Sequence, residues 1–366
     1  MRLEFSSVIY ENPLPQLRSV MSTFPGIAQL PSGRIIAVYT LGEAFESIDG
    51  TAYISFSDDG GKTFSAPRRI LDKSEEKIRM TDYAKPTVTP DGKIIIFGYR
   101  YFRENPDLPL GNAENGGTLP DEIFMLESHD EGGNFTKPAV IPSTFGNSVE
   151  ASAPLYVLSD GSLATPITCF PDWSGNLDSR LCGRLLISRD GGKSFDDSTV
   201  CTAFPGDTVT CYEQRMCETE SGALVVVSWN EDTKTGERMN NHITISRDGG
   251  RSFSAPIDTG VRGQATGILS LGGERVMTLH AVRRDTDAPG IYAVIADVSC
   301  GWRVISSERV WAPKTPMVKS ANMAEIFSFL KFGQPSAIKL EDGGILMTHW
   351  TSEDGVYKTV VNKFCL

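Results

Sequence analysis

Polar and aromatic side chains recur at two kinds of position in this 366-residue chain, just before and just after short runs of β-forming residues. The first kind comprises Phe24, Asp82, Tyr83, Lys85, Glu150, Tyr212, Glu213, Gln214, Arg262, Gln264 and Gln334. The second comprises residues 43–49, Arg100, Tyr101, Asp172, Trp173, Trp229, Asn230, His280, Arg283, Arg284, His349 and Trp350. Carboxylates and arginines bind sugar hydroxyls, and aromatic faces stack on pyranose rings. If the fold gathers these segments, they form a carbohydrate site; the alternative is a solvated rim of ordinary polar loops.

A repeated pattern predicts the elements that position these residues. Six times the chain has a short polar segment, four or five alternating residues, a tight turn and a β-branched run. The turns are Ser32-Gly33, Asp91-Gly92, Asp160-Gly161, Ser221-Gly222, Gly272-Gly273 and Asp342-Gly343. Hairpin units at such a period are typical of propeller blades. We therefore expect an all-β chain, with residues 1–366 forming one six-bladed β-propeller domain.

The two ends of the chain fit a closed ring. Residues 2–10 have the composition of a strand, and residues 356–363 follow a last hairpin turn at Asp354-Gly355. A propeller closes when one terminus completes the blade of the other, which removes an open sheet edge. We expect residues 2–10 to pair with residues 356–363. Residues 320–332 are the only stretch in which a helical turn or two is expected.

A second repeat lies in four other turns. It consists of Ser-x-Asp-x-Gly, one further residue, a Ser, Thr or Asn, and a Phe, with its aspartates at Asp59, Asp130, Asp190 and Asp248. The Asp is expected to accept backbone N–H bonds, the Gly to supply positive φ, and the Phe to fix the hairpin to its blade. These segments resemble the Asp-box, or BNR repeat, of the sialidase (neuraminidase) superfamily. The resemblance implies outer hairpins remote from the sugar site.

The same resemblance implies roles for two carboxylates. Sialidases carry an acid/base Asp before the second strand of blade one, and a Glu opening blade four that activates a Tyr nucleophile opening blade six. Asp49, before residues 52–56, and Glu213 match the first two positions. Gln334 occupies the place of the Tyr, and Phe24 the place of one of three arginines that bind the substrate carboxylate. Arg238, Arg283 and Arg284 are candidates for the other two.

A second group of the clan fits the carboxylates differently. The exo-arabinanases are similar six-bladed propellers that use a Glu opening blade three and another opening blade four. Glu150 and Glu213 hold those places. A retaining pair needs carboxyl groups about 5–5.5 Å apart and an inverting pair about 6.5–9.5 Å. Both pairings, Asp49 with Glu213 and Glu150 with Glu213, therefore stay open.

The other titratable candidates each have two interpretations. Asp82 and Lys85 form either part of the site or an ion pair that orders a loop. His280 and His349 end inner strands, where an imidazole either contacts a sugar or is satisfied structurally. The four His show no metal-ligand spacing, so we expect neither a metal nor another cofactor.

Composition narrows the remaining classes. A net charge of −11 with scattered acidic residues argues against nucleic acid as a partner. Seven Cys without CxxC spacing, no apolar run of membrane-spanning length and no signal-like beginning predict a cytoplasmic protein that does not enter membranes. The sequence therefore favours an exo-acting glycoside hydrolase of small oligosaccharides or glycosides. The alternative from another class is a non-catalytic carbohydrate-binding propeller.

Overall fold

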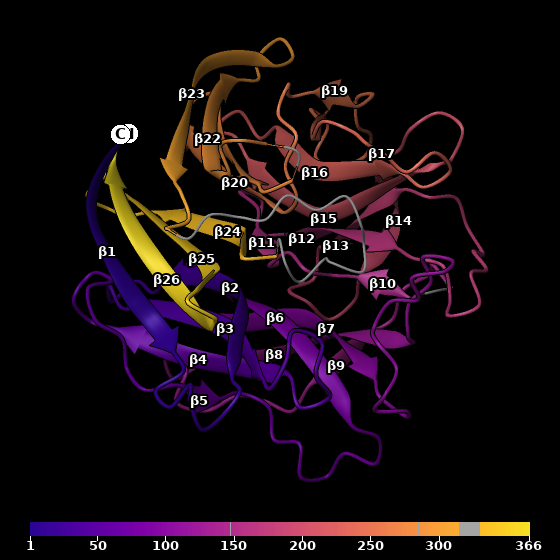
Figure 1. Cartoon of the computed structure of the whole chain (residues 1–366). Coiled ribbons are helices and arrows are strands. Elements are labelled where there is room, and N and C mark those ends of the chain that lie inside the picture. The colour runs from indigo at the N-terminus through magenta and orange to yellow at the C-terminus, as the bar shows by residue number, and fades with distance from the viewer. Residues whose placement is uncertain (147, 285, 315–329) are drawn as a thin grey trace.

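Six antiparallel sheets surround a common axis in the computed structural model, which describes residues 1–146, 148–284, 286–314 and 330–366 (Figure 1). Blade one contains β2 (Met21–Gln29), β3 (Ile35–Gly42), β4 (Thr51–Ser57) and β5 (Arg68–Arg69). Blade two contains β6 (Met80–Val88), β7 (Ile94–Phe102), β8 (Asp121–Ser128) and β9 (Ala139–Ile141). Blade three contains β10 (Val149–Glu150), β11 (Tyr156–Val157), β12 (Leu163–Cys169), β13 (Gly183–Ser188) and β14 (Asp196–Thr202).

The second half of the ring follows the same plan. Blade four contains β15 (Val209–Glu218), β16 (Leu224–Asp232), β17 (Glu237–Arg238), β18 (His242–Ser246) and β19 (Ile257–Asp258). Blade five contains β20 (Thr266–Gly272), β21 (Arg275–Val282), β22 (Gly290–Asp297) and β23 (Arg303–Trp311). Blade six contains β24 (Phe332–Lys339), β25 (Ile345–Glu353), β26 (Val356–Cys365) and β1 (Arg2–Glu11). The predicted all-β, six-bladed propeller is thereby confirmed.

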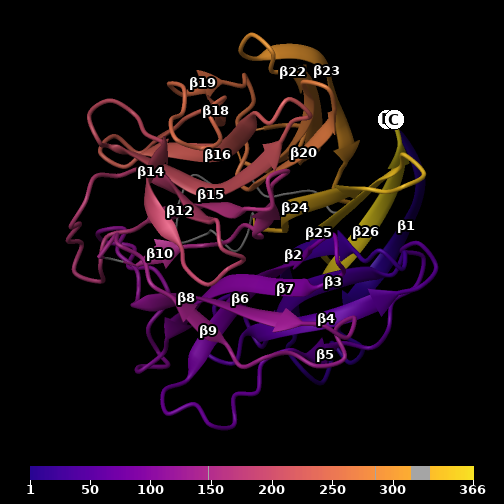
Figure 2. The same ribbon diagram turned by 180° about the vertical axis from the view of Figure 1, so that it is seen from behind.

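Both chain ends belong to blade six. β1 pairs antiparallel with β26, from Arg2 opposite Cys365 to Glu11 opposite Lys358, as expected from the sequence. Figure 2 shows the two strands side by side at the rim, seen from behind. The 320–332 stretch falls mainly outside the described residues, and its end, Phe332, begins β24. No helix in the described part of the chain is long and apolar enough to cross a membrane.

The four Ser-x-Asp turns lie beyond the third strand of their blades. At the first of them, the Asp59 Oδ1 accepts the backbone N–H groups of Lys62 and Thr63 at 3.0 and 2.9 Å. The glycine at the fifth position of this turn, Gly61, has a φ of 91°, which an L side chain rarely adopts. Hydrogen bonds from the Asn134 backbone and side chain likewise lower the pKa of Asp130 to about 2. These aspartates order hairpins, as the pattern predicts.

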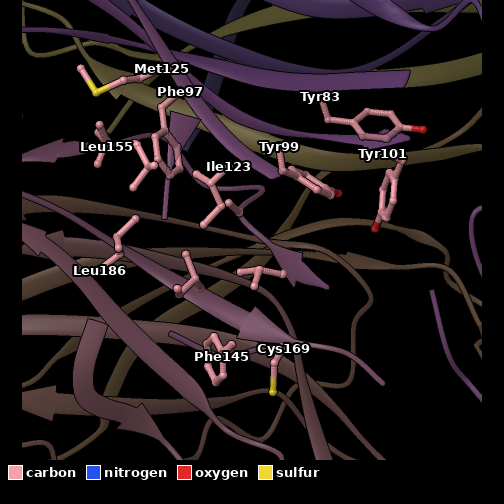
Figure 3. Packing of buried hydrophobic residues seen from close by; sticks show 14 of the residues in the cluster. Tyr83, Phe97, Tyr99, Tyr101, Ile123, Met125, Phe145, Leu155, Cys169 and Leu186 are labelled. Atoms are coloured by element: carbon pink, nitrogen blue, oxygen red, sulfur yellow. The ribbon is translucent and has the colours of Figure 1, made fainter. Parts of the chain in front are cut away.

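The hydrophobic core lies between neighbouring blades. In the largest cluster, Phe97, Ile123 and Met125 of blade two face Leu155 and Leu186 of blade three (Figure 3). A strand that is buried on both faces has a continuous apolar sequence. Residues 94–97 are an example, because all four are inaccessible to solvent. This packing fixes each inner strand beside the axis, where its first residues meet those of other blades.

Candidate active site

Four inner strands share one backbone irregularity at the same end of the axis. Phe24, Glu213, Ala265 and Gln334 have positive φ values of 53°, 43°, 64° and 48°. The ladder shifts register at three of them, between Thr23 and Gly26, Tyr212 and Arg215, and Gly333 and Ser336. Left-handed backbone is uncommon for residues other than Gly, Asn and Asp, and it clusters at functional sites. The irregularity is therefore a reason to look for a site here.

The side chain of Glu213 is held from two blades. Trp229 Nε1, on the neighbouring β16, donates to Glu213 Oε2 at 2.9 Å, and Gln334 Nε2 of blade six donates to Glu213 Oε1. Tyr212 stacks on Trp229 with 4.1 Å between ring centroids and 16° between planes. Burial raises the pKa of Tyr212 to about 12, so its ring serves as a neutral support for the indole. Two donors thus orient one carboxylate.

Glu150 lies directly beside Glu213. Its Oε2 accepts the backbone N–H of Glu213 at 3.0 Å, and Ser152 donates to its Oε1. Ser152 in turn accepts from Arg215 Nη1 at 3.0 Å. Burial, followed by repulsion from Glu213, raises the pKa of Glu150 to about 7. A buried, protonated carboxyl group beside a hydrogen-bonded carboxylate can supply a proton at neutral pH.

Aromatic rings from three blades surround the irregular residue of blade one. Phe24 contacts Tyr83 edge-on at 4.5 Å between centroids and Phe45 at 5.1 Å, and Phe45 contacts Trp350 at 5.8 Å. Tyr83 continues into Tyr99 and Tyr101, and Figure 3 shows these three rings together beside the apolar cluster. Burial raises the pKa of all three tyrosines well above 10, so their hydroxyls remain protonated.

Two basic side chains, Lys85 and Arg283, also lie near Glu213. Lys85 Nζ donates to Gln334 Oε1 at 3.3 Å, and Arg283 Nη1 donates to the Phe332 carbonyl at 2.5 Å. A side chain at Gly333 would place its Cβ 2.4 Å from Arg283 Nη1, so this glycine makes room for the guanidinium. Burial lowers the pKa of Arg283 to about 10, and it remains charged at neutral pH.

Three expected site residues have their contacts elsewhere. Asp49 is exposed, its carboxylate accepts the Glu43 backbone N–H at 3.1 Å, and it lines a groove with Tyr10 and Arg69 rather than contacting Glu213. The suggested Asp82–Lys85 ion pair is wrong, because residues three apart on β6 point to opposite faces. Asp82 is instead paired with Lys73 at 2.6 Å. Arg100 forms an ion pair with Glu122.

The histidines and the remaining candidates have mixed surroundings. Both ring nitrogens of His280 have partners, Asn241 at 2.9 Å and Thr278 at 2.8 Å, which supports the structural interpretation. Burial lowers the pKa of His280 and of His349 to about 3. Trp173 is half-buried against the core of blades two and three. Gln264 Oε1 and Trp350 Nε1 are buried without a hydrogen-bond partner among the described residues.

One carboxyl group was missed within the acidic loop 43–49. Glu46 Oε2 accepts the Leu110 N–H at 3.1 Å, and burial raises the pKa of Glu46. It follows Phe45, which reaches Phe24, whereas Asp49 turns away. Three acidic residues in one loop offer no sequence signal that selects Glu46. Among the described residues, no cluster of His, Cys, Asp or Glu has the arrangement of a metal site.

Comparison with known proteins supports the fold. No protein-family model and no curated protein matches the chain. A protein of unknown function from Dyadobacter fermentans superposes with a TM-score of 0.75 and 19% identity, over 99% of this chain and 98% of that one. The NanB sialidase of Streptococcus pneumoniae, in complex with a chlorobenzylammonio-ethanesulfonate, has a TM-score of 0.66 and 14% identity over 99% of this chain. A Trypanosoma rangeli sialidase, solved as a covalent intermediate with difluorosialic acid, has a TM-score of 0.63 and 14% identity, also over 99%.

These likenesses define the class of fold. The chain is a six-bladed β-propeller with the fold of the sialidases, and it spans 70% of NanB and 57% of the trypanosomal enzyme. At such identities the likeness concerns the arrangement of the strands and not the chemistry of the site. The function must therefore be argued from the side chains at the axis.

Proposed function

We propose that this chain is a glycoside hydrolase of the sialidase superfamily in which Glu150 and Glu213 are the two reacting carboxyl groups. The observation that carries the proposal is their juxtaposition: Glu150 accepts the Glu213 backbone N–H at 3.0 Å, yet the two side chains have opposite surroundings. Glu150 is buried with a pKa raised to about 7, chiefly by burial. Glu213 is partly exposed and receives two side-chain N–H donors, which orient its carboxyl oxygens.

Different surroundings suit the two carboxyl groups to different roles. Protonated Glu150 donates its proton to the glycosidic oxygen as the bond to the anomeric carbon breaks. Glu213 either stabilises the positive charge that develops on the sugar while water attacks the anomeric carbon, or forms a bond to that carbon that water then hydrolyses. The substrate is a small oligosaccharide or glycoside that is cleaved from its end. Phe24, which is half-buried, offers apolar surface to a sugar ring.

The residue at position 334 supports a second candidate function, carbohydrate binding without cleavage. Gln334 occupies the place that the sialidase resemblance gives to a nucleophilic Tyr, and its amide is engaged with Glu213. An amide is not a nucleophile for this reaction, so a propeller that binds carbohydrate without cleaving it is the second candidate.

The deciding experiment is a screen of aryl glycosides that includes arabinofuranosides, hexosides, hexuronides and sialosides. The proposal predicts turnover of at least one substrate, which Glu213→Gln and Glu150→Gln reduce by at least about a hundredfold. Asp49→Asn serves as the matched control and should retain turnover, because its carboxylate caps a backbone N–H in a separate groove. Loss of activity in Asp49→Asn with full activity in Glu150→Gln would assign the acid/base role to Asp49. A parent protein that binds sugars and cleaves none favours the second candidate.

A further inference from the structure

The amino group of Lys85 is buried between three blades. The residue is 4% exposed and lies on β6, and burial lowers its pKa well below 10.5. Its Nζ donates to the carbonyls of Phe24 and Pro25 at 2.6 and 2.7 Å and to Gln334 Oε1 at 3.3 Å. While protonated, the Lys85 amine has three N–H donors and no acceptor, so these contacts use every donor. All three partners come from other blades, one and six.

This contact determines which way the Gln334 amide faces. With Oε1 against Lys85, the Nε2 group must face Glu213, where it donates to Oε1. A flipped amide would place its N–H donors against the ammonium group and its oxygen against a carboxylate. Both contacts would then be repulsive. A protonated Lys85 can only donate, so in that state its contact with Gln334 Oε1 removes the ambiguity that usually attends a glutamine amide.

The backbone around Lys85 is shaped to admit it. A Cβ at position 26 would lie 2.8 Å from Lys85 Cδ and 2.7 Å from Pro86 Cδ, so Gly26 leaves the space for the lysine stem. The carbonyl that Phe24 offers to Lys85 belongs to a residue with a φ of 53°, and the amide partner Gln334 has a φ of 48°. Burying a charged or ionisable group costs free energy that packing alone does not return. We therefore expect a buried lysine with three hydrogen-bond acceptors to have a function at the neighbouring site.

We propose that Lys85 is a positioning residue, which locks the Gln334 amide so that its Nε2 donates to Glu213 and holds that carboxylate toward the sugar. The inference rests on the proposed hydrolase function, since the orientation of Glu213 matters only if Glu213 reacts. Lys85 acts through Gln334 and does not touch the substrate. Its removal frees the amide to rotate and leaves Trp229 as the single side-chain donor to Glu213 among the described residues.

A double-mutant cycle tests the route of the effect. Kinetic constants are measured for the parent, Lys85→Met, Gln334→Ala and the double variant, with the best glycoside from the screen. We expect Lys85→Met to lower kcat by roughly ten- to a hundredfold, the worth of one hydrogen bond to a charged group, with KM nearly unchanged. In the Gln334→Ala background the same substitution should have no further effect on kcat. Losses that multiply in the double variant would overturn the proposal.

Two further variants separate positioning from folding. Lys73 is a matched lysine, because its Nζ also contacts two backbone carbonyls and a side chain, Asp82, but not Gln334. Lys73→Met should combine independently with Gln334→Ala. Gly26→Ala keeps the lysine but displaces its stem, and should reproduce the kcat loss of Lys85→Met. A Gly26→Ala protein with parental kcat would contradict the proposal, even if Lys85→Met does not fold.

A spectroscopic measurement is independent of activity. In protein labelled with nitrogen-15 in glutamine side chains, the Gln334 amide signal is identified by its absence in Gln334→Ala. We expect this signal to shift in Lys85→Met and in Gly26→Ala, but not in Lys73→Met. If the parent cleaves no glycoside, the proposed function fails while the amide signal still decides the contact. An unchanged signal in Lys85→Met would show that Lys85 does not hold Gln334.

Discussion

Replacing Glu150 by Gln should change how stability depends on pH. An unfolded glutamate titrates near 4.5, whereas burial and the neighbouring Glu213 raise the pKa of Glu150 to about 7 in the folded protein. The folded state therefore holds a proton that the unfolded state has lost. The stabilisation is complete below pH 4.5 and disappears as the pH rises through 7. Gln keeps the shape and the acceptor for the Glu213 N–H but cannot ionise.

The size of the effect follows from the two pKa values. With one proton binding at 4.5 in the unfolded and about 7 in the folded state, the parent loses roughly 2 to 3 kcal/mol of stability between pH 5 and pH 8. Glu150→Gln lacks this loss. The free energy of unfolding of the variant, relative to the parent, should accordingly be larger at pH 8 than at pH 5 by roughly 2 to 3 kcal/mol, so the variant gains stability relative to the parent.

Urea unfolding at both pH values measures the difference directly. Asp130→Asn is the matched control, because hydrogen bonds lower the pKa of Asp130 to about 2 and it stays ionised in both states at pH 5 and pH 8. Its substitution should reduce stability equally at the two pH values. If the difference between Glu150→Gln and the parent is the same at pH 5 and pH 8, Glu150 does not titrate as its burial requires. Glu150 would then not be the proton donor at neutral pH either.

Two other predictions concern the scaffold. Burial lowers the pKa of His280 to about 3, so the stabilisation by its neutral imidazole is present above pH 6.5 and is lost as the pH falls. Between pH 7 and pH 4, the melting temperature of His280→Gln should therefore fall less steeply than that of the parent. Identical slopes for the two proteins would contradict a buried neutral imidazole. Deleting residues 1–11 removes β1 and exposes the edge of β26, so light scattering should show aggregation that grows with protein concentration. A monomeric variant with the parental melting temperature would instead show that blade six closes without β1.

The fold was predictable because its signals are local. Each hairpin turn carries Gly in a left-handed conformation, for example Gly92 with a φ of 88°, between runs of β-forming residues. Such turns recur once in every blade, so counting them counts the blades. The pairing of residues 2–10 with the last strand also followed, because a ring must complete its final blade. None of these steps requires knowing which side chains touch.

The site was predictable only in outline, because its contacts join blades that are distant in the sequence. An ion pair of Lys85 with Asp82, three positions away, was one of two interpretations, yet the partners of Lys85 are Phe24, Pro25 and Gln334. Phe24, Glu213 and Gln334 have left-handed conformations, but none of them is a Gly, Asn or Asp, the residue types that would indicate this conformation in a sequence. The path of one loop partly buries Glu46 and leaves Asp49 exposed, and the sequence does not show this path. Sequence spacing places residues at the axis but does not show where each side chain points.

The strained residues and the contacts between blades depend on each other. A left-handed residue other than Gly costs of order 1–3 kcal/mol and persists only when its surroundings hold it. At Phe24 the Lys85 ammonium group holds the carbonyl, and at Glu213 the backbone N–H is held by Glu150 and the carbonyl by Thr266 at 3.2 Å. Gln334 lies on β24, in the sheet that also contains both ends of the chain. One of the two side-chain donors to Glu213 therefore comes from the blade that closes the ring, and the orientation of this carboxylate depends in part on that closure.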